Sequence, residues 1–250
     1  FLSDGGRIHI MKQQVIYRDL AKYYDLIYSF KNYEAESKKI KELITRHCKS
    51  QGKSLLEAGC GTGKHAALLS KYFDVVATDI NEGMLNVART HFPNLNIRQA
   101  DMSQLNLEQE FDVIISLYSS IAYVKTQEKL KRTLQSFLGH LKVGGLVIFE
   151  PWFTKATYTV GVPSIKTYES EDTKIVRACV PKIINDVSVM DLNYLIAEKN
   201  QDVLHVVDRH EMGLFEVEKT LQLMRDIGFK AKYLKNGLMK NRGLYIGVKK

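Results

Sequence analysis

Hydrophobic residues recur along this chain with two different spacings, and the change of spacing divides the chain into regions. From Leu55 to Phe149, short apolar runs alternate with stretches of helical periodicity, which is the pattern of a doubly wound parallel sheet. Five of these runs are expected to be strands: Leu55–Ala58, Val75–Asp79, Leu95–Gln99, Phe111–Leu117 and Leu146–Phe149. From Tyr158 to about His210, apolar and polar residues alternate instead. That alternation predicts three or four antiparallel strands, inserted after the fifth parallel strand.

The two ends of the chain complete this pattern. Val15–Phe30 and Tyr33–Cys48 carry apolar residues at helical spacing and are expected to be helices. The first is rich in tyrosine, which fits either core packing or a lid over the loop that follows the first strand. At the other end, a helix over Phe215–Ile227 is followed by two closing strands, Ala231–Leu234 and Leu244–Val248.

We therefore predict an α/β fold: a doubly wound, seven-stranded, mostly parallel sheet of Rossmann-like type, with a C-terminal antiparallel hairpin and an inserted small antiparallel sheet. The expected domains are a helical lid over residues 11–50, a core over residues 51–156 and 211–250, and the β insertion over residues 157–210. Residues 1–10 precede an internal methionine and look irregular, so we take them as a cloning remnant or an upstream extension.

The first predicted strand opens into a glycine loop with glycine at positions 59, 61 and 63, and a helix follows. Such glycines let the backbone turn sharply and approach a ligand, while the helix offers unpaired N–H groups. The spacing GxGxG differs from the dinucleotide fingerprint GxGxxG, and no GK[ST] is present, so Lys64 is not a phosphate-clamping lysine. Glu57 suits a cationic ligand that carries an amino group. The alternative is a plain strand-to-helix turn.

Two further acidic residues follow predicted strands. Asp79 lies 20 residues after Gly59, where this architecture places a carboxylate that receives both hydroxyls of a ribose. The alternative is that Asp79 caps the helix that starts at Asn81. After the third strand, Asp101 and Met102 are candidates to bracket an adenine, by a hydrogen bond to its amino group and by contact with its face.

The carboxyl edge of the predicted sheet offers a second candidate ligand site. The loop Tyr118–Tyr123 follows the fourth strand, at the edge where open α/β sheets bind their ligands. Trp152, the only tryptophan of the chain, follows the fifth strand. It is expected either to line a pocket or to anchor the crossover from the sheet into the β insertion.

Composition restricts the partners and the location. The net charge of +8 and pI near 9.2 permit a phosphorylated small molecule, RNA or an anionic membrane as partner, but the lysines are spread along the chain. The three cysteines show no CxxC spacing and no grouping with the seven histidines, which argues against a disulfide scaffold or structural zinc. No apolar run of about 18 residues and no signal peptide are visible, so we expect a cytoplasmic protein without a membrane span.

The order of elements and the motifs resemble the class I S-adenosylmethionine-dependent methyltransferases. The first motif of that superfamily matches Glu57–Gly63, its acidic second motif matches Asp79, and its closing hairpin matches the C-terminal strands. The resemblance implies S-adenosylmethionine (SAM) as the cofactor. It assigns Glu57 to the methionine ammonium, Asp79 to the ribose, and Asp101 with Met102 to the adenine.

Four segments outside the cofactor motif carry a narrower resemblance. They are Tyr24–Tyr28, Tyr118–Thr126, Val147–Trp152 and Asn241–Val248, in that order. Together they look like the N,N-dimethyltransferases of nucleotide-linked amino sugars, the desosamine type. That resemblance implies that Tyr28 and Tyr123 lie near the accepting nitrogen and that Arg242 meets the nucleotide diphosphate. It also assigns to the β insertion an antiparallel layer and the contact of a homodimer.

These assignments give the full set of expected site residues. Tyr28 and Tyr123 are expected to orient the amine. The residues expected to bind the cofactor are Tyr24, Glu57, Gly59, Gly61, Asp79, Ile80, Met84, Asp101, Met102 and Leu117. Those expected to contact the substrate are Ser119, Ser120, Trp152 and Arg242, and no metal is needed.

Rival functions share part of these features. An NAD-dependent oxidoreductase would share the loop and Asp79, but it prefers GxGxxG, with glycine where Lys64 stands. A methyltransferase of a glycine-like amine or of RNA would share the cofactor site. We favour a small-molecule acceptor over nucleic acid, because no (N/D)PP(Y/F) motif follows the fourth strand and no RNA-binding module is appended. A cofactor-binding regulator without turnover is the non-enzymatic alternative.

Overall fold

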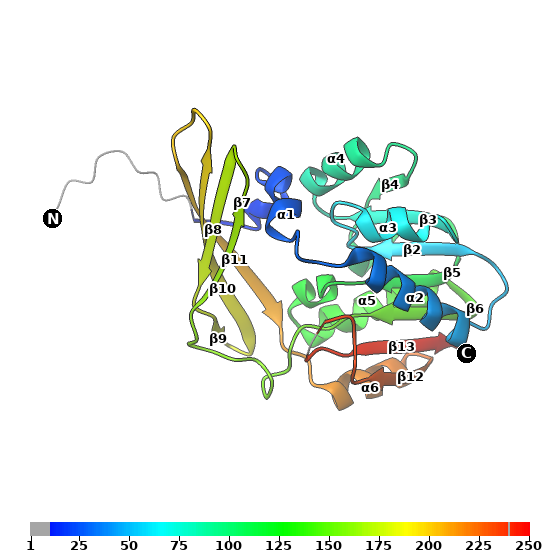
Figure 1. Ribbon diagram of the computed structural model, residues 1–250. Coiled ribbons are helices and arrows are strands. Elements are labelled where there is room, and N and C mark those ends of the chain that lie inside the picture. The colour runs from blue at the N-terminus through cyan, green and yellow to red at the C-terminus, as the bar shows by residue number, and fades with distance from the viewer. Residues whose placement is uncertain (1–10, 240) are drawn as a thin grey trace. The chain divides into compact units, whose positions relative to one another are not determined.

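The structure of the protein is a computed structural model, and it describes residues 11–239 and 241–250 (Figure 1). The chain forms two compact units. The larger unit holds Lys31–Tyr158 and Met212–Lys250, and the smaller one holds Thr159–Glu211 together with the described residues up to Phe30. Each unit is therefore built from segments that lie far apart in the sequence.

The larger unit is built on a seven-stranded sheet. Its strands are β2 Ser54–Ala58, β3 Asp74–Asp79, β4 Asn96–Gln99, β5 Phe111–Ser116, β6 Leu141–Phe149, β12 Phe229–Leu234 and β13 Leu244–Lys249. They lie in the order β12-β13-β6-β5-β2-β3-β4. The five strands from β6 to β4 are parallel, whereas β13 is antiparallel to both β6 and β12. The predicted doubly wound sheet with a C-terminal antiparallel hairpin is confirmed.

Helices cover both faces of this sheet. They are α2 Tyr33–His47, α3 Lys64–Leu69, α4 Glu82–His91, α5 Gln127–Gly139 and α6 Val217–Asp226, with 3-10 turns η2 Met102–Gln104 and η3 Ser120–Val124. Phe137 of α5 and Met224 of α6 belong to one apolar cluster. Ile40 of α2, Ala66 of α3 and Leu85 of α4 belong to a second one. Because the central strands are covered on both faces, their sequences are continuous apolar runs.

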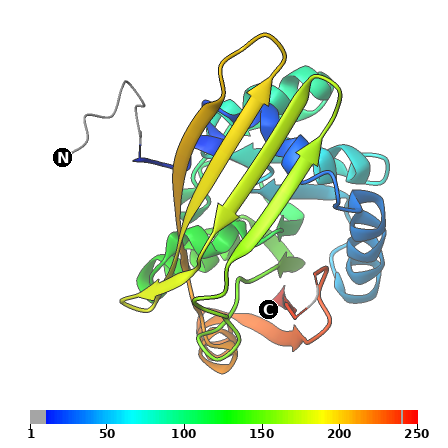
Figure 2. The same ribbon diagram turned by 60° about the vertical axis from the view of Figure 1, so that its left-hand side comes forward.

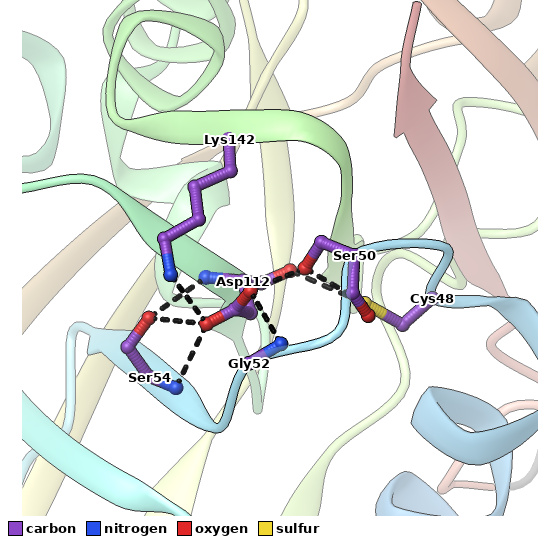
Figure 3. A network of polar contacts seen from close by, with 6 residues as sticks. All are labelled: Cys48, Ser50, Gly52, Ser54, Asp112 and Lys142. Atoms are coloured by element: carbon purple, nitrogen blue, oxygen red, sulfur yellow. Dashed lines mark hydrogen bonds and ion pairs between the residues drawn. The ribbon is translucent and has the colours of Figure 1, made fainter.

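A buried carboxylate joins several segments at the amino ends of the central strands, opposite the glycine loop (Figure 3). Asp112 of β5 accepts hydrogen bonds from the N–H groups of Gly52 and Ser54, both at 3.0 Å, and from the hydroxyl groups of Ser50 and Ser54. It also pairs with Lys142 at 2.9 Å. Burial alone raises the pKa of Asp112, but these contacts outweigh it and hold that pKa well below its usual range. One side chain thus joins the α2–β2 connection to β5 and β6.

The smaller unit is built on a separate six-stranded sheet. Its strands are β1 Met11–Gln13, β7 Ser164–Glu169, β8 Thr173–Cys179, β9 Lys182–Ile184, β10 Val187–Glu198 and β11 Leu204–Gly213. The order is β1-β11-β10-β8-β7, and β9 pairs with β10. Figure 2 shows the long strands of this sheet, coloured from yellow-green to orange, side by side. The inserted antiparallel sheet is confirmed.

The insertion contains five strands, so the predicted three or four is wrong. The run over residues 173–184 is interrupted at Pro181, which has no N–H to donate to a ladder, and it forms two strands, β8 and β9. Asn185 and Asp186 then turn the chain with positive φ angles of 48° and 68°, as a two-residue hairpin requires. The long strand β10 pairs with β9 at its start and with β8 at its end.

The predicted single helix over Val15–Phe30 is also wrong. A 3-10 turn, η1 (Val15–Tyr17), precedes a short helix, α1 (Ala21–Ile27). The buried carboxylate of Asp208 on β11 accepts hydrogen bonds from the first two N–H groups of η1, at 2.8 and 3.0 Å. Those bonds fix the start of the segment to the second sheet. The predicted domain over residues 11–50 is accordingly divided between the two units after Phe30, and its role as a lid stays a prediction.

Three observations concern membranes, metals and thiols. Within residues 11–239 and 241–250, no helix is long and apolar enough to cross a bilayer. Over the same ranges, no three side chains of His, Cys, Asp or Glu are grouped to hold a metal ion. The three cysteines are free thiols. The predicted irregular segment 1–10 lies outside the described residues.

Candidate active site

The glycine loop has a backbone that only glycine adopts without strain. Gly59, Gly61 and Gly63 have positive φ angles of 78°, 56° and 78°. A Cβ on Gly59 would lie 2.6 Å from the Cβ of Ser120, and one on Gly61 would lie 3.2 Å from the terminal methyl of Met84. The loop therefore combines a turn with close approach of neighbouring side chains, and both features exclude a residue with a Cβ at Gly59.

Asp79 at the end of β3 is bonded to that loop. The N–H of Gly61 donates to Oδ2 of Asp79 and the N–H of Asn81 donates to Oδ1, both at 2.9 Å. Asp79 is 8% exposed, and burial raises its pKa while these N–H groups oppose the rise. Oδ1 also accepts from the side-chain amide of Asn81 at 3.4 Å, whereas Oδ2 keeps a further lone pair, which fits a hydroxyl of a ribose. The N-cap residue of α4 is Asn81, so Asp79 bonds the residue at the cap without being the cap itself.

Glu57 on β2 is a buried carboxylate with an open oxygen. Its residue is 1% exposed, and no hydrogen-bond partner for Oε2 lies among the described residues. Burial raises the pKa of Glu57 to about 8, against the attraction of the Lys31 ammonium. A buried oxygen without a donor is costly unless a ligand supplies one. The amino group predicted for the ligand fits this oxygen.

A chain of contacts that sequence reasoning missed leads to Glu57 from Lys31 through Glu36 and His65. Lys31 pairs with Glu36 at 3.3 Å, and Nε2 of His65 bonds the same Glu36 oxygen at 2.7 Å. Nδ1 of His65 lies 3.8 Å from Oε1 of Glu57. These residues come from the start of α2 and of α3, and no spacing rule connects them. Nothing in the sequence pattern could have grouped them.

The residues predicted for the adenine and the cofactor rim lie around the ends of β3, β4 and β5. Ile80 is 56% exposed, although it is large and apolar, whereas Met84 and Leu117 are buried. The carboxylate of Asp101 caps η2 by accepting from the N–H of Ser103 at 2.8 Å. The remaining acceptor capacity of Asp101 and the exposed face of Ile80 are available to a base.

The loop after β5 is strained and is held at two points. Tyr118 and Ser119 have consecutive positive φ angles of 52° and 63°, which non-glycine residues rarely adopt. The N–H of Tyr118 donates to Oε2 of Glu150 at 2.8 Å, and the hydroxyl of Ser119 donates to the carbonyl of Pro151 at 2.6 Å. Next to them, the Ser120 hydroxyl lies 3.2 Å from the carbonyl of Gly59. The predicted acceptor loop thus adjoins the glycine loop.

Arg242 fixes the same strained loop from the C-terminal side. Its Nη1 donates to Oγ of Ser119 at 2.7 Å, and its guanidinium lies over the ring of Trp152, 4.8 Å from the centroid. The rings of Tyr118 and Phe153 are also within 5.7 Å. Arg242 is 6% exposed, and no partner for its Nε lies in the described part of the chain. Trp152 therefore packs on Arg242 just after β6. This position is compatible with both predictions for Trp152, lining a pocket and anchoring the crossover into the β insertion.

The two predicted N-terminal tyrosines lie in the smaller unit. The rings of Tyr24 and Tyr28 are 4.5 Å apart, and the guanidinium of Arg177 on β8 donates to the Tyr28 hydroxyl at 2.9 Å. Arg177 was missed by sequence reasoning. The other predicted site residues all belong to the larger unit, with Tyr123 on η3.

The fold and the site define a class of protein. A parallel sheet closed by an antiparallel β13, a glycine loop after its first strand, and an acid after its second describe the SAM-dependent methyltransferases. The residues present fit that cofactor, because Glu57 offers an open oxygen to an ammonium and Asp79 offers lone pairs beside the loop. In agreement, residues 55–145 match the family described as "Methyltransferase domain".

Relatives narrow the class further. The chain is 32% identical over 233 residues to dTDP-3-amino-3,4,6-trideoxy-alpha-D-glucopyranose N,N-dimethyltransferase of Streptomyces venezuelae, covering 92% of this chain and 98% of that one. The crystal structure of Streptomyces venezuelae DesVI has 31% identity and a TM-score of 0.86, covering 93% and 99%. SAM-bound CalS10, an amino pentose methyltransferase from Micromonospora echinaspora, has the same fold at 20% identity and a TM-score of 0.81, covering 97% and 99%.

The chain belongs to the DesVI-type family of SAM-dependent sugar N,N-dimethyltransferases. It is a SAM-dependent N-methyltransferase, as the resemblance of its motifs implied, and SAM is its cofactor. The oxidoreductase alternative is therefore wrong.

Proposed function

We propose that this enzyme transfers methyl groups from SAM to the amino group of a nucleotide-linked amino sugar. The observation that carries the proposal is the extent of the similarity: 32% identity covers 92% of this chain, far more than the methyltransferase domain over residues 55–145. A cofactor domain shared with unrelated methyltransferases would match the first half of the larger unit alone. The named relative acts on a dTDP-linked amino sugar, and the same class of acceptor is assigned here.

The reaction is an in-line displacement in which positive charge leaves the sulfonium sulfur and develops on the nitrogen. The protein has to align nitrogen, methyl carbon and sulfur and to exclude water. Glu57 holds the methionine ammonium, Asp79 the ribose hydroxyls, and Asp101 with Met102 the adenine. Tyr24, Ile80, Met84 and Leu117 complete the cofactor contacts around the glycines of the loop. No metal takes part in the scheme.

The amine must present a free lone pair to the methyl group, so its ammonium proton has to be lost first. Tyr28 and Tyr123 orient the amine, and solvent takes the proton. The hydrogen bond from Arg177 fixes the position of the Tyr28 hydroxyl, which supports an orienting role.

The nucleotide part of the acceptor is assigned to the loop after β5 and to Arg242. A guanidinium presents a planar set of donors that suits phosphate oxygens, and the Nε of Arg242 has no partner among the described residues. Ser119 and Ser120 supply hydroxyls beside it, and Trp152 supplies a ring. Two further expectations remain predictions: a cytoplasmic location, and a homodimer formed through the β insertion.

A methyl-transfer assay with labelled SAM tests the proposal. The acceptors are a dTDP-linked 3-amino sugar, the same sugar without the nucleotide, glycine and tRNA. We expect one and then two methyl groups on the nucleotide-linked sugar, weak transfer to the free sugar, and none to glycine or tRNA. Transfer to glycine or tRNA instead, or no transfer to the dTDP sugar by protein that binds SAM normally, would refute the acceptor class.

A further inference from the structure

We propose that Lys31 binds the α-carboxylate of the methionine part of SAM, as the partner of Glu57, which takes the α-ammonium. Lys31 directly precedes α2, whose start is fixed by its capping residue Asn32. The inference concerns the cofactor alone. It therefore stands or falls independently of the sugar acceptor, because SAM binding is measured without an acceptor.

The Lys31 ammonium is buried but incompletely partnered. Its side chain is 3% exposed, and its one ion-pair partner among the described residues is Glu36, at 3.3 Å. The ammonium lies 3.4 Å over the ring of Tyr118 and 4.7 Å from the ring centroid of Tyr33. An ammonium has three N–H donors, and Glu36 occupies one direction. Burying such a group is costly unless the remaining donors find acceptors, so a ligand oxygen fits here.

Lys31 and Glu57 are two buried ionisable side chains of the larger unit. Each acts on the charge of the other, yet no ion pair within 4.0 Å joins them in the described chain. Oε2 of Glu57 has no donor. The protein thus presents two buried ionisable groups that act on each other's charge, and Oε2 of Glu57 and the remaining N–H groups of Lys31 keep unused hydrogen-bonding capacity. The ammonium and carboxylate of an α-amino acid are two opposite charges on one carbon, and they complete both groups.

Glu36 joins the Lys31 ammonium to the His65 ring. One oxygen of Glu36 receives both the Lys31 ammonium and Nε2 of His65. Burial lowers the pKa of His65, which favours the neutral ring, and a neutral ring that donates to Glu36 carries its proton on Nε2. Nδ1 then presents a lone pair toward Glu57. A neutral histidine leaves the positive charge on Lys31 and does not neutralise Glu57 in place of the cofactor.

The charge of the site fits this arrangement. Lys31 faces Glu36, Glu57 and Glu150, so negative charge exceeds positive charge when all are ionised. Burial raises the pKa of Glu150 as well as that of Glu57, because both carboxylates are removed from water. SAM carries a sulfonium, an ammonium and a carboxylate, so it brings a net positive charge. Lys31 offers a positive partner to the SAM carboxylate, while the three glutamates keep the site attractive to the net positive charge of SAM.

The test compares SAM with decarboxylated SAM, which lacks the α-carboxylate, in calorimetric binding to wild-type protein and variants. Wild type is expected to bind SAM at least about tenfold more tightly, since a charge-assisted contact is worth about 1.5–3 kcal/mol. Lys31→Met should weaken SAM by about tenfold or more but decarboxylated SAM by less than about threefold. Lys31→Arg should keep most of the preference.

Lys64→Met is the matched control, because Lys64 is a lysine over the same Tyr33 ring, 5.1 Å from its centroid, at the start of α3. It should leave the preference for SAM unchanged. Equal weakening of both ligands by Lys31→Met would show that Lys31 only supports the fold. Equal affinity of wild type for the two ligands would overturn the proposal without any variant, whether or not Lys31→Met folds.

Discussion

The backbone N–H of Gly61 donates to Oδ2 of Asp79 over 2.9 Å. This bond makes the glycine loop and the acid at the end of β3 one structural unit. A change at Asp79 therefore acts on the cofactor in two ways. It removes the acceptor for the ribose hydroxyls, and it leaves the loop N–H without a partner, so the loop loses the shape in which it receives the cofactor.

Asp79→Ala should lower the affinity for SAM by more than about tenfold, since a hydrogen bond to a charged acceptor contributes about 1.5–3 kcal/mol. Calorimetric titration with SAM measures this directly. Asp74→Ala is the matched control, because Asp74 is the exposed acid at the other end of β3. If Asp79→Ala binds SAM as tightly as wild type, the ribose assignment is wrong.

Cofactor binding should depend on pH through Glu57. The pKa of Glu57 is raised to about 8 in the free protein, so the carboxyl is protonated at lower pH and has to lose a proton to pair with the SAM ammonium. Affinity should rise by up to about tenfold per pH unit from pH 6 to about 8 and then level off. The charged and titratable groups that face Glu57 are Lys31, Cys60, His65 and Asp79.

Calorimetry in buffers of different ionisation heat detects the released proton. Glu57→Gln should bind SAM weakly and with little pH dependence over the same range. Glu42→Gln is the matched control, because Glu42 is exposed on α2 and its replacement removes an acid without touching the site. Flat affinity of wild type between pH 6 and 8 would show that Glu57 is already ionised in the free protein.

The same raised pKa predicts the stability of the ligand-free enzyme. A carboxyl whose folded pKa exceeds its unfolded value stabilises the fold below the unfolded pKa of 4.5, and this contribution is lost as pH rises through about 8. At pH 9, Glu57→Gln should therefore have a free energy of unfolding about 1–3 kcal/mol higher than wild type, and it should unfold at a higher denaturant concentration. Saturating SAM should reverse the order. Equal stability of the two proteins at pH 9 would contradict the prediction.

Arg242 and Ser119 allow two roles of the arginine to be separated. Arg242→Lys keeps the charge but loses the fork, so it should raise KM for a dTDP-linked acceptor by about tenfold and leave SAM binding unchanged. Ser119→Ala removes the contact between Arg242 and the strained loop but keeps the guanidinium. It should change KM less than Arg242→Lys does. If the two variants have equal effects, Arg242 acts by holding the loop and not by contacting the diphosphate.

The parallel sheet was predictable because its strands are continuous apolar runs and its glycine loop is a local signature. Local patterns could not foresee the break between η1 and α1, which depends on Asp208, a residue that reaches η1 only through the second sheet. The group of Lys31, Glu36 and His65 was unpredictable for the same reason. Its members are ordinary surface residue types in sequence, and only the packing of α2 against α3 makes them neighbours.

The bonds around Asp112 predict a stability difference that depends on pH. Asp112→Asn replaces one carboxylate oxygen by an NH₂ group that faces N–H and O–H donors, so it should lower the free energy of unfolding at pH 7 by about 1–3 kcal/mol. The lowered pKa of Asp112 means that wild type has this stabilisation above the unfolded pKa of 3.8 and loses it as pH falls further. The difference should therefore shrink below about pH 4.

Urea unfolding of both proteins between pH 3 and 7 measures the difference. Lys142→Met is the control for the ion pair alone. The Lys142 side chain is 42% exposed, so its pair with Asp112 should contribute less than about 1 kcal/mol at any of these pH values. A loss in Lys142→Met as large as that in Asp112→Asn would locate the stabilisation in the ion pair. A pH-independent difference would show that the charge of Asp112 is not what its donors stabilise.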